Sequence, residues 1–308
     1  MDAYFLVGAT AVGKSAVAQC LAERRGCGVL SADSMSIYCG MDIGTAKPGK
    51  AERGDVRYYG IDIVEPWERF SVWEYRKHAL WALEQERDGG GLIVAGGTGL
   101  YVKSLMQGLR AEVGEDAALR AEWAARVQAE GVGALQDYVR RVAPDAFARL
   151  SDRENPRRLV RVLELAAAGG DDRRDWERPA GGGRPVGLFM ERELLLGRIE
   201  LRVKQMYAGG LLAEVERLLS GGFELSETAR QAIGYAEAIG CLRGELTQAE
   251  ALERTVIRTR RLAKRQMTWF RHQVEVDWVE VVAGAEVEGI ADKVEELWGR
   301  NGATEIRE

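Results

Sequence analysis

An eight-residue segment near the start of the chain has the residue types and spacing of a phosphate-binding loop. It reads Gly8-Ala9-Thr10-Ala11-Val12-Gly13-Lys14-Ser15 and fits the pattern G-x-x-x-x-G-K-[ST]. Glycines let backbone N–H groups converge on phosphate oxygens, and the N-terminus of a following helix adds positive potential. Lys14 supplies a point charge, and the Ser15 hydroxyl can hold Mg²⁺. A plain glycine-rich turn is the alternative, but the pattern predicts a polyphosphate site, and we call residues 8–15 the P-loop.

Two further segments carry side chains suited to chemistry beside a phosphate. Asp33, followed by Ser34, ends an apolar run, and its carboxylate could ligate magnesium, act as a general base, or cap a helix or loop. The glycine-rich segment 96–99 also follows an apolar run, and Thr98 is its one chemical handle. Close approach of the backbone to a ligand explains these glycines, and a tight structural turn explains them nearly as well.

An arginine pair later in the chain could also serve a phosphate. Arg198 and Arg202 are four residues apart, so they share one face of a helix. The planar guanidinium group forks onto phosphate oxygens, which would make the pair a phosphate clamp. Ordinary surface ion pairing to Glu200 or its neighbours is the alternative.

Residues 254–271 carry seven basic side chains and no acidic one: Arg254, Arg258, Arg260, Arg261, Lys264, Arg265 and Arg271. Four of these recur on one face of the predicted helix, Arg261 and Arg265 among them. The apolar side chains on another face are expected to pack on the core: Val256, Ala263, Met267 and Phe270. A solvated basic face is the common reading of such a run. In a chain of net charge −5, however, the uninterrupted run favours a polyanionic partner.

The order of predicted elements indicates an α/β fold. Strand-like runs at 3–7, 28–32, 61–64, 92–95 and 185–190 alternate with helical segments, notably 15–22 and 72–85. This alternation favours a P-loop NTPase-like parallel sheet flanked by helices. Ligands of such sheets bind at the carboxyl ends of the strands. We therefore expect the P-loop, Asp33 and Thr98 to meet in one cleft.

The strand signal disappears in the middle of the chain. Segments 116–130, 134–142 and 156–168 all have the pattern of helices, and helices dominate again from 194 to 270. We therefore expect residues 1–110 and 184–308 to form the α/β core with a helical C-terminal part. Residues 111–183 are expected to form a helical insertion domain, which carries a second basic cluster that includes Arg157, Arg158 and Arg161.

Composition bounds the classes of protein to which this chain can belong. Its 308 residues, 46% hydrophobic and 30% charged, are typical of an ordinary globular protein. No apolar run approaches the roughly 20 residues of a membrane span, and no signal peptide is recognisable, so we expect a cytoplasmic protein. The four cysteines lack C-x-x-C spacing and are expected to be reduced. With only two histidines, a histidine-based metal site or general base is not expected.

Taken together, these segments resemble the tRNA dimethylallyltransferases, also called isopentenyl-tRNA transferases, in their bacterial form. The resemblance spans roughly residues 4–271. It rests on the P-loop, Asp33-Ser34 through Tyr38, Gly40–Pro48, Gly96–Tyr101, Asn155–Arg158, Arg198-Ile199 with Arg202, Gly234-Tyr235 and Leu262–Gln266. The Gly40–Pro48 block and the ordered set of motifs are far more specific than a P-loop alone. Here Ala9 and Val12 replace the usual proline and serine, and Ala236 stands where a basic residue is usual.

The resemblance implies transfer of a dimethylallyl group from its diphosphate to the adenosine just 3′ of the tRNA anticodon, with release of diphosphate. It assigns Asp33 as the base, Thr98 as its support, and Arg202 with the P-loop and a Ser15-held Mg²⁺ as the diphosphate site. The same resemblance, with the basic clusters, implies tRNA contacts from a larger set: Asp33, Ser34, Met35, Ser36, Thr98, Arg157, Arg158, Arg161, Gly234, Tyr235, Arg261 and Arg265. A monomer is expected.

Two other classes of function remain as alternatives. A small-molecule kinase would use the P-loop for ATP, but gives no reason for the basic helix. A non-catalytic RNA-binding switch would bind nucleotide without forming a product. Prenyl transfer from labelled dimethylallyl diphosphate to tRNA distinguishes all three.

Overall fold

A computed structural model of the chain describes residues 2–87, 89–109, 116–150, 152–169, 183–222 and 224–306. The chain divides into two compact units. The first combines Met1–Gln107 with Pro179–Glu308, and the second is Gly108–Arg178. None of the helices within the described residues has the length and apolarity needed to cross a bilayer.

A seven-stranded sheet forms the centre of the first unit. Its strands are β1 (Asp2–Gly8), β2 (Gly28–Ala32), β3 (Tyr58–Tyr59), β4 (Leu92–Gly96), β5 (Val186–Phe189), β6 (Asp277–Glu280) and β7 (Thr304–Glu305). Strands β3-β2-β4-β1-β5-β6 are parallel in this order, and β7 runs antiparallel beside the start of β1. The expected parallel α/β fold is confirmed. Because Val7 and Ala32 both lie opposite Gly96, the carboxyl ends of β1, β2 and β4 meet at one edge.

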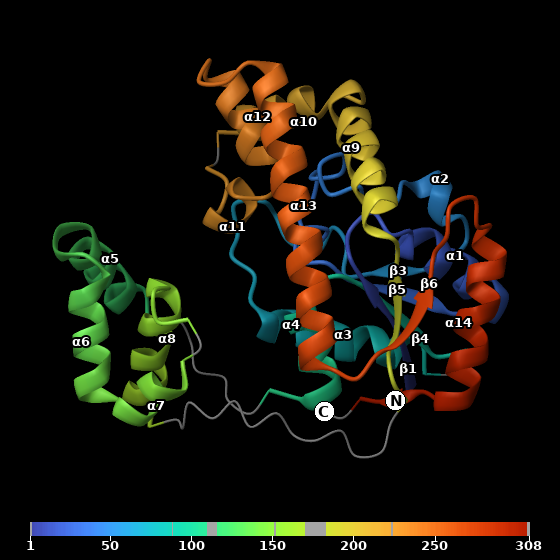
Figure 1. The fold of residues 1–308 in the computed structure, drawn as a ribbon, viewed down its shortest axis with the longest axis horizontal. Coiled ribbons are helices and arrows are strands. Elements are labelled where there is room, and N and C mark those ends of the chain that lie inside the picture. The colour runs from blue at the N-terminus through green and yellow to red at the C-terminus, as the bar shows by residue number, and fades with distance from the viewer. Residues whose placement is uncertain are drawn as a thin grey trace. The chain divides into compact units, whose positions relative to one another are not determined.

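Helices cover both faces of this sheet (Figure 1). The described helices of the unit are α1 (Lys14–Arg25), α2 (Lys50–Arg53), α3 (Val72–Gln85), α4 (Gly99–Gln107), α9 (Arg192–Ala208), α10 (Leu211–Ser220), α11 (Glu227–Arg230), α12 (Tyr235–Leu242), α13 (Gln248–Gln273) and α14 (Val287–Asn301). Successive strand residues point to opposite faces. Leu6 and Ile93 therefore pack in the core beside α1 and α14, whereas Phe5 and Val94 pack in the core beside α3, α4 and α13.

A further core joins the helical C-terminal part of this unit to the segment that follows β2. Buried side chains from α9, α10, α12 and the first half of α13 surround Tyr38 and Met41. Figure 1 shows these helices beyond one end of the sheet. The helical part therefore rests on the segment that carries the Gly40–Pro48 block.

The strand expected at 61–64 is wrong, and the edge strand instead lies at Tyr58–Tyr59. Gly60 (φ 73°) and Asp62 (φ 51°) adopt left-handed backbone, which interrupts an extended run. The Asp62 carboxylate pairs with Lys47 Nζ at 2.6 Å, so this segment serves as a loop anchor.

The second unit consists of helices in its described part. They are α5 (Ala117–Glu130), α6 (Val132–Val142), α7 (Pro144–Arg149) and α8 (Pro156–Ala167). The three helices expected here are present, and α7 is an addition that the short pattern did not reveal. Trp123, Leu135 and Leu159 are buried in its core. Burial alone would raise the pKa of Glu164, but hydrogen bonds from Arg120 and Arg161 hold it below its usual value.

Candidate active site

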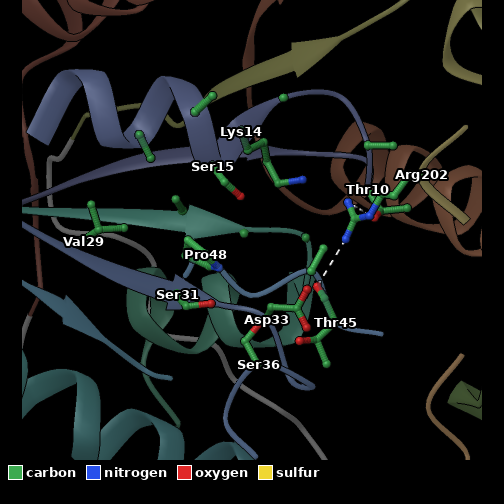
Figure 2. Close-up of a pocket in the computed structure, with 18 of the residues that line it drawn as sticks. Thr10, Lys14, Ser15, Val29, Ser31, Asp33, Ser36, Thr45, Pro48 and Arg202 are labelled. Carbon is green, nitrogen blue, oxygen red and sulfur yellow. Dashed lines mark hydrogen bonds between the residues drawn. The ribbon is translucent and has the colours of Figure 1, made fainter. Parts of the chain in front are cut away.

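A cavity of about 410 Å³ opens at the carboxyl ends of β1, β2 and β4 (Figure 2). The polar side chains that line it come from the P-loop, from β2 and the residues after it, and from α9 and α13: Thr10, Lys14, Ser15, Ser31, Asp33, Ser36, Thr45, Arg198, Arg202, Gln205 and Gln266. The structure thus brings the P-loop, Asp33 and Arg202 into one cavity, although Arg202 is far from the other two in sequence.

The P-loop glycines sit where other residues would be strained. Gly8 (φ 143°) and Gly13 (φ 107°) have left-handed backbone, and a Cβ on Gly8 would lie 2.5 Å from the Leu188 carbonyl oxygen. α1 begins directly after Gly13. The N–H groups of its first turn therefore lie at the end of the helix that borders the cavity. Lys14 Nζ donates to the carbonyl oxygens of Gly8 (3.0 Å) and Ala9 (2.6 Å). The ammonium group is therefore folded across the loop.

Burial disfavours the charged form of the cations in this cavity. It lowers the pKa of Lys14 to about 8; the Asp33 carboxylate opposes this shift, and Arg202 adds to it. Burial also lowers the pKa of Arg202, and Asp33 again opposes the shift. Two half-buried positive groups with one carboxylate nearby would gain from an anion with more charge.

Asp33 is oriented by the turn that follows β2. Its Oδ1 accepts a hydrogen bond from the Met35 N–H at 2.9 Å, and the Ser34 N–H donates to Thr98 Oγ1 at 3.0 Å. The Thr98 N–H in turn donates to the Ala32 carbonyl at 2.9 Å. Thr98 therefore holds the turn that presents Asp33, whereas Ser36 is the member of this turn that lines the cavity with Asp33.

Arg202 bridges the P-loop and the Gly40–Pro48 block (Figure 2). Its guanidinium donates to Thr10 Oγ1 (3.3 Å) and to the Thr45 carbonyl oxygen (3.2 Å). Arg198, one helical turn earlier, lines the same cavity. Glu200, the alternative ion-pair partner, instead contacts Lys204 at 2.8 Å and Arg260 at 3.4 Å. Both arginines therefore lie at the cavity, and the alternative pairing with Glu200 is not found for either of them within the described residues.

Helix α13 packs against two of the glycines of segment 96–99, Gly97 and Gly99. A Cβ on Gly97 would lie 2.3 Å from Gln266 Nε2, and a Cβ on Gly99 would lie 2.2 Å from the Trp269 ring. Close packing against this helix favours glycine at both positions, and Gly97 also lines the cavity. Gln266 Oε1 also accepts a hydrogen bond from the Thr10 N–H at 2.8 Å. Gln266 is not among the site residues expected from the sequence, although it belongs to the Leu262–Gln266 motif that supports the family resemblance.

The basic side chains of α13 fall into two groups. Arg258 pairs with Glu237 at 2.5 Å, and Arg260 pairs with Glu200. The remaining ones are exposed: Arg254, Arg261, Lys264, Arg265 and Arg271. Within the part of the chain that the structure describes, no carboxylate forms an ion pair with Arg261 or Arg265. The apolar face packs as expected, with Val256, Ala263 and Phe270 buried.

The other expected tRNA contacts lie outside the cavity. Gly234 (φ 92°) caps α12, and Tyr235, the first residue of that helix, is 0% exposed. The Tyr235 side chain therefore has no surface to offer to a tRNA, which argues against its expected contact. Arg157, Arg158 and Arg161 begin α8 in the second unit, where Arg161 donates to Glu164 at 3.0 Å.

Known proteins share this architecture. A family model described as IPP transferase matches residues 36–273. A tRNA dimethylallyltransferase of Geobacter metallireducens is 43% identical over 281 residues, which cover 89% of this chain and 90% of that protein. One of Pelotomaculum thermopropionicum is 40% identical over 296 residues, which cover 94% of each. The crystal structure of a Bacillus halodurans tRNA isopentenylpyrophosphate transferase superimposes with a TM-score of 0.71 and 35% identity, and covers 97% of this chain and 96% of that one.

The chain belongs to the IPP transferase family. This membership makes it a prenyltransferase of the kind that transfers a dimethylallyl group. The P-loop and Asp33 precede the range matched by the family model, but the relatives align over nearly the whole chain. The cavity described above therefore lies in the part shared with the family.

Prenyltransferases of the IPP transferase family typically need a divalent metal. Within the described residues, no group of three or more His, Cys, Asp or Glu side chains could hold a metal alone. The Ser15 hydroxyl lines the cavity beside Lys14, and such a hard oxygen donor suits Mg²⁺. This hydroxyl fits a metal whose remaining ligands come from substrate phosphate and water.

Proposed function

We propose that this chain transfers the dimethylallyl group of dimethylallyl diphosphate to the exocyclic amine of the adenosine just 3′ of the anticodon in tRNA. One observation carries the assignment: a carboxylate, Asp33, and the cations Lys14 and Arg202 line a single cavity. A base and a site for a departing anion are the two groups that N-prenylation of adenine requires. The names of the relatives supply the identity of the two substrates.

The leaving diphosphate binds at the P-loop end of this cavity. Negative charge accumulates on it as the allylic C–O bond breaks. Lys14, Arg202 and the N–H groups at the start of α1 are fixed before the reaction, so they stabilise this charge without reorganisation. Mg²⁺ held by Ser15 and the diphosphate would neutralise further charge.

Asp33 removes the proton of the adenine amine as the new C–N bond forms. The lone pair of this amine is delocalised into the ring, so a positioned base aids its attack. Met35 N–H occupies Asp33 Oδ1, and no described residue donates a hydrogen bond to Oδ2. The second oxygen is thus the one we assign to the amine proton, while Thr98 keeps the turn in place.

The tRNA is held by basic side chains of both units. The exposed Arg261 and Arg265 on α13, and Arg157, Arg158 and Arg161 on α8, contact backbone phosphates of the anticodon stem-loop. The target base leaves its stack to enter the cavity. We further propose that the enzyme acts as a monomer in the cytoplasm.

Incubation of the protein with tRNA, Mg²⁺ and labelled dimethylallyl diphosphate tests the function. After digestion of the tRNA, we expect the label on one adenosine 3′ of the anticodon. ATP labelled at its γ-phosphate, with the same tRNA, is the control. Label transfer from ATP alone would favour a kinase, and transfer from neither donor would contradict prenyl transfer.

A further inference from the structure

We propose that Tyr235 and Glu214 are positioning residues for the diphosphate-binding Arg202, although neither side chain lines the cavity. They act through the loop of residues 40–48, whose Thr45 carbonyl accepts a hydrogen bond from Arg202. This inference rests on the proposed function, because it takes Arg202 to bind the leaving diphosphate.

Glu214 of α10 fixes the middle of this loop through hydrogen bonds to its backbone. It is 3% exposed, and its carboxylate accepts hydrogen bonds from the backbone N–H groups of Ile43 (2.9 Å) and Asp42 (3.2 Å). Its Oε1 also accepts a hydrogen bond from the Tyr235 hydroxyl at 2.5 Å. A buried carboxylate with three donors, two of them on one loop, restricts where that loop can lie.

The Tyr235 ring supports the same loop by packing. A Cβ on Gly44 would lie 2.3 Å from a ring carbon of Tyr235, so only glycine lets the loop rest directly on the ring. Burial and the bond to Glu214 raise the pKa of Tyr235, which keeps its hydroxyl protonated as a donor. Thr45 follows Gly44 in sequence, and its carbonyl oxygen accepts the hydrogen bond from the Arg202 guanidinium.

A second anchor holds the ends of the loop. Lys47 Nζ donates to Asp42 (2.7 Å), to Asp62 (2.6 Å) and to the Tyr38 carbonyl oxygen (2.8 Å). With both of its ends and its middle fixed, the loop offers the Thr45 carbonyl at a defined place. The other contact of Arg202, to Thr10, belongs to the P-loop itself. The Gly40–Pro48 loop is therefore the partner of Arg202 whose position depends on Tyr235 and Glu214.

The position of Tyr235 is itself fixed from α13. Arg258 pairs with Glu237 Oε1, and Glu237 Oε2 accepts a hydrogen bond from the Gly234 N–H at 2.8 Å. Arg258 also donates to the Gln231 carbonyl at 2.7 Å. Arg258, a member of the basic run at 254–271, thus anchors the start of α12.

Tyr235→Phe and Glu214→Gln test the inference, with Tyr207→Phe as matched control. Tyr207 is also buried, in the same core, and its hydroxyl contacts Thr255 rather than the loop. We expect Tyr235→Phe to weaken inorganic diphosphate binding and to raise KM for dimethylallyl diphosphate about tenfold, since small displacements of a binding group are costly. The Kd for tRNA should stay within about twofold of wild type.

Thermal unfolding of each variant separates loss of fold from loss of position. Tyr207→Phe should lower stability to a similar degree while keeping wild-type diphosphate affinity. Equal diphosphate affinity in wild type and Tyr235→Phe would overturn the inference, as would an equal loss in Tyr207→Phe. Should Glu214→Gln not fold, Tyr235→Phe alone decides. Failure of wild-type enzyme to prenylate tRNA would instead overturn the proposed function.

Discussion

At the scale of single residues, the candidate active site places one carboxylate beside two half-buried cations. Asp33 opposes the lowered pKa of both Lys14 and Arg202, so the three charges are coupled in the free protein. A diphosphate would bring the negative charge that the cations lack. An adenine amine would meet the carboxylate. The charges of the cavity thus suit both substrates of the proposed reaction.

Asp33→Ala should reduce turnover by about 10²-fold or more, because that is the usual contribution of a general base. The binding of tRNA should be retained, since the phosphate contacts that dominate its affinity lie elsewhere. Single-turnover rates and a tRNA binding titration measure the two effects. Asp55→Ala, at an exposed position, is the control, and wild-type turnover in Asp33→Ala would remove Asp33 from the mechanism.

Lys14 makes diphosphate binding depend on pH. Its pKa of about 8 means that the free site loses this positive charge as the pH rises through 8. A bound diphosphate favours the charged form and raises the pKa, so binding above pH 8 takes up a proton. We expect affinity to fall from pH 7 to pH 9, by as much as about tenfold per pH unit above 8.

Calorimetric titration with inorganic diphosphate in buffers of different ionisation enthalpy measures this proton uptake. Lys14→Arg is the control, because a guanidinium group does not titrate in this range whereas the ligand still does. The same pH dependence in both proteins would mean that the ligand alone titrates.

At the scale of elements, α13 connects the site with the surface of its unit. Gln266 contacts the P-loop, and Gln266 and Trp269 pack on the glycines of segment 96–99. The same helix exposes Arg261 and Arg265. One helix therefore supports the P-loop and presents positive charge to solvent.

Arg261→Ala and Arg265→Ala should each weaken tRNA binding and reduce its dependence on salt. Loss of one phosphate contact lowers the slope of log K against log salt by about 1. Binding titrations over a range of KCl concentrations give this slope. Arg24→Ala, which removes an arginine paired with Asp292 between α1 and α14, should leave it unchanged. Unaltered affinity and slope in both α13 variants would indicate a merely solvated face.

At the scale of the whole molecule, the two units have separate tasks in our proposal. Every residue that lines the cavity belongs to the first unit, whereas Arg157 and Arg158 are exposed in the second. In this proposal, dimethylallyl diphosphate binds to the first unit alone, whereas tRNA contacts both units.

The double variant Arg157→Ala/Arg158→Ala should raise the Kd for tRNA and leave the Kd for inorganic diphosphate unchanged. The reason is that these side chains lie in the unit without the cavity. Parallel titrations with the two ligands measure the difference. Arg126→Ala, whose arginine stacks on Trp123 in the same unit, controls for a general loss of charge. Wild-type tRNA affinity in the double variant would remove α8 from the tRNA interface.

The sequence by itself determined the features that depend on local patterns. Glycine spacing predicts the P-loop, and hydrophobic periodicity predicts the end of β2 at Asp33 and the helix 72–85. Both signals depend only on residues that are close in sequence. The parallel sheet follows from the alternation of strands and helices. The same local reasoning failed at 61–64, where Lys47 draws Asp62 into a loop, a contact that apolar periodicity does not encode.

Only the tertiary structure decided which residues that are distant in sequence contact one another at the site. It placed Arg202 between Thr10 and Thr45, Gln266 on the P-loop, and Tyr235 beneath Gly44. These contacts join segments up to 256 residues apart, and helix packing rather than local propensity creates them. Tertiary ion pairing then decides which charges remain available: Arg258 pairs with Glu237, whereas Arg261 is exposed to solvent.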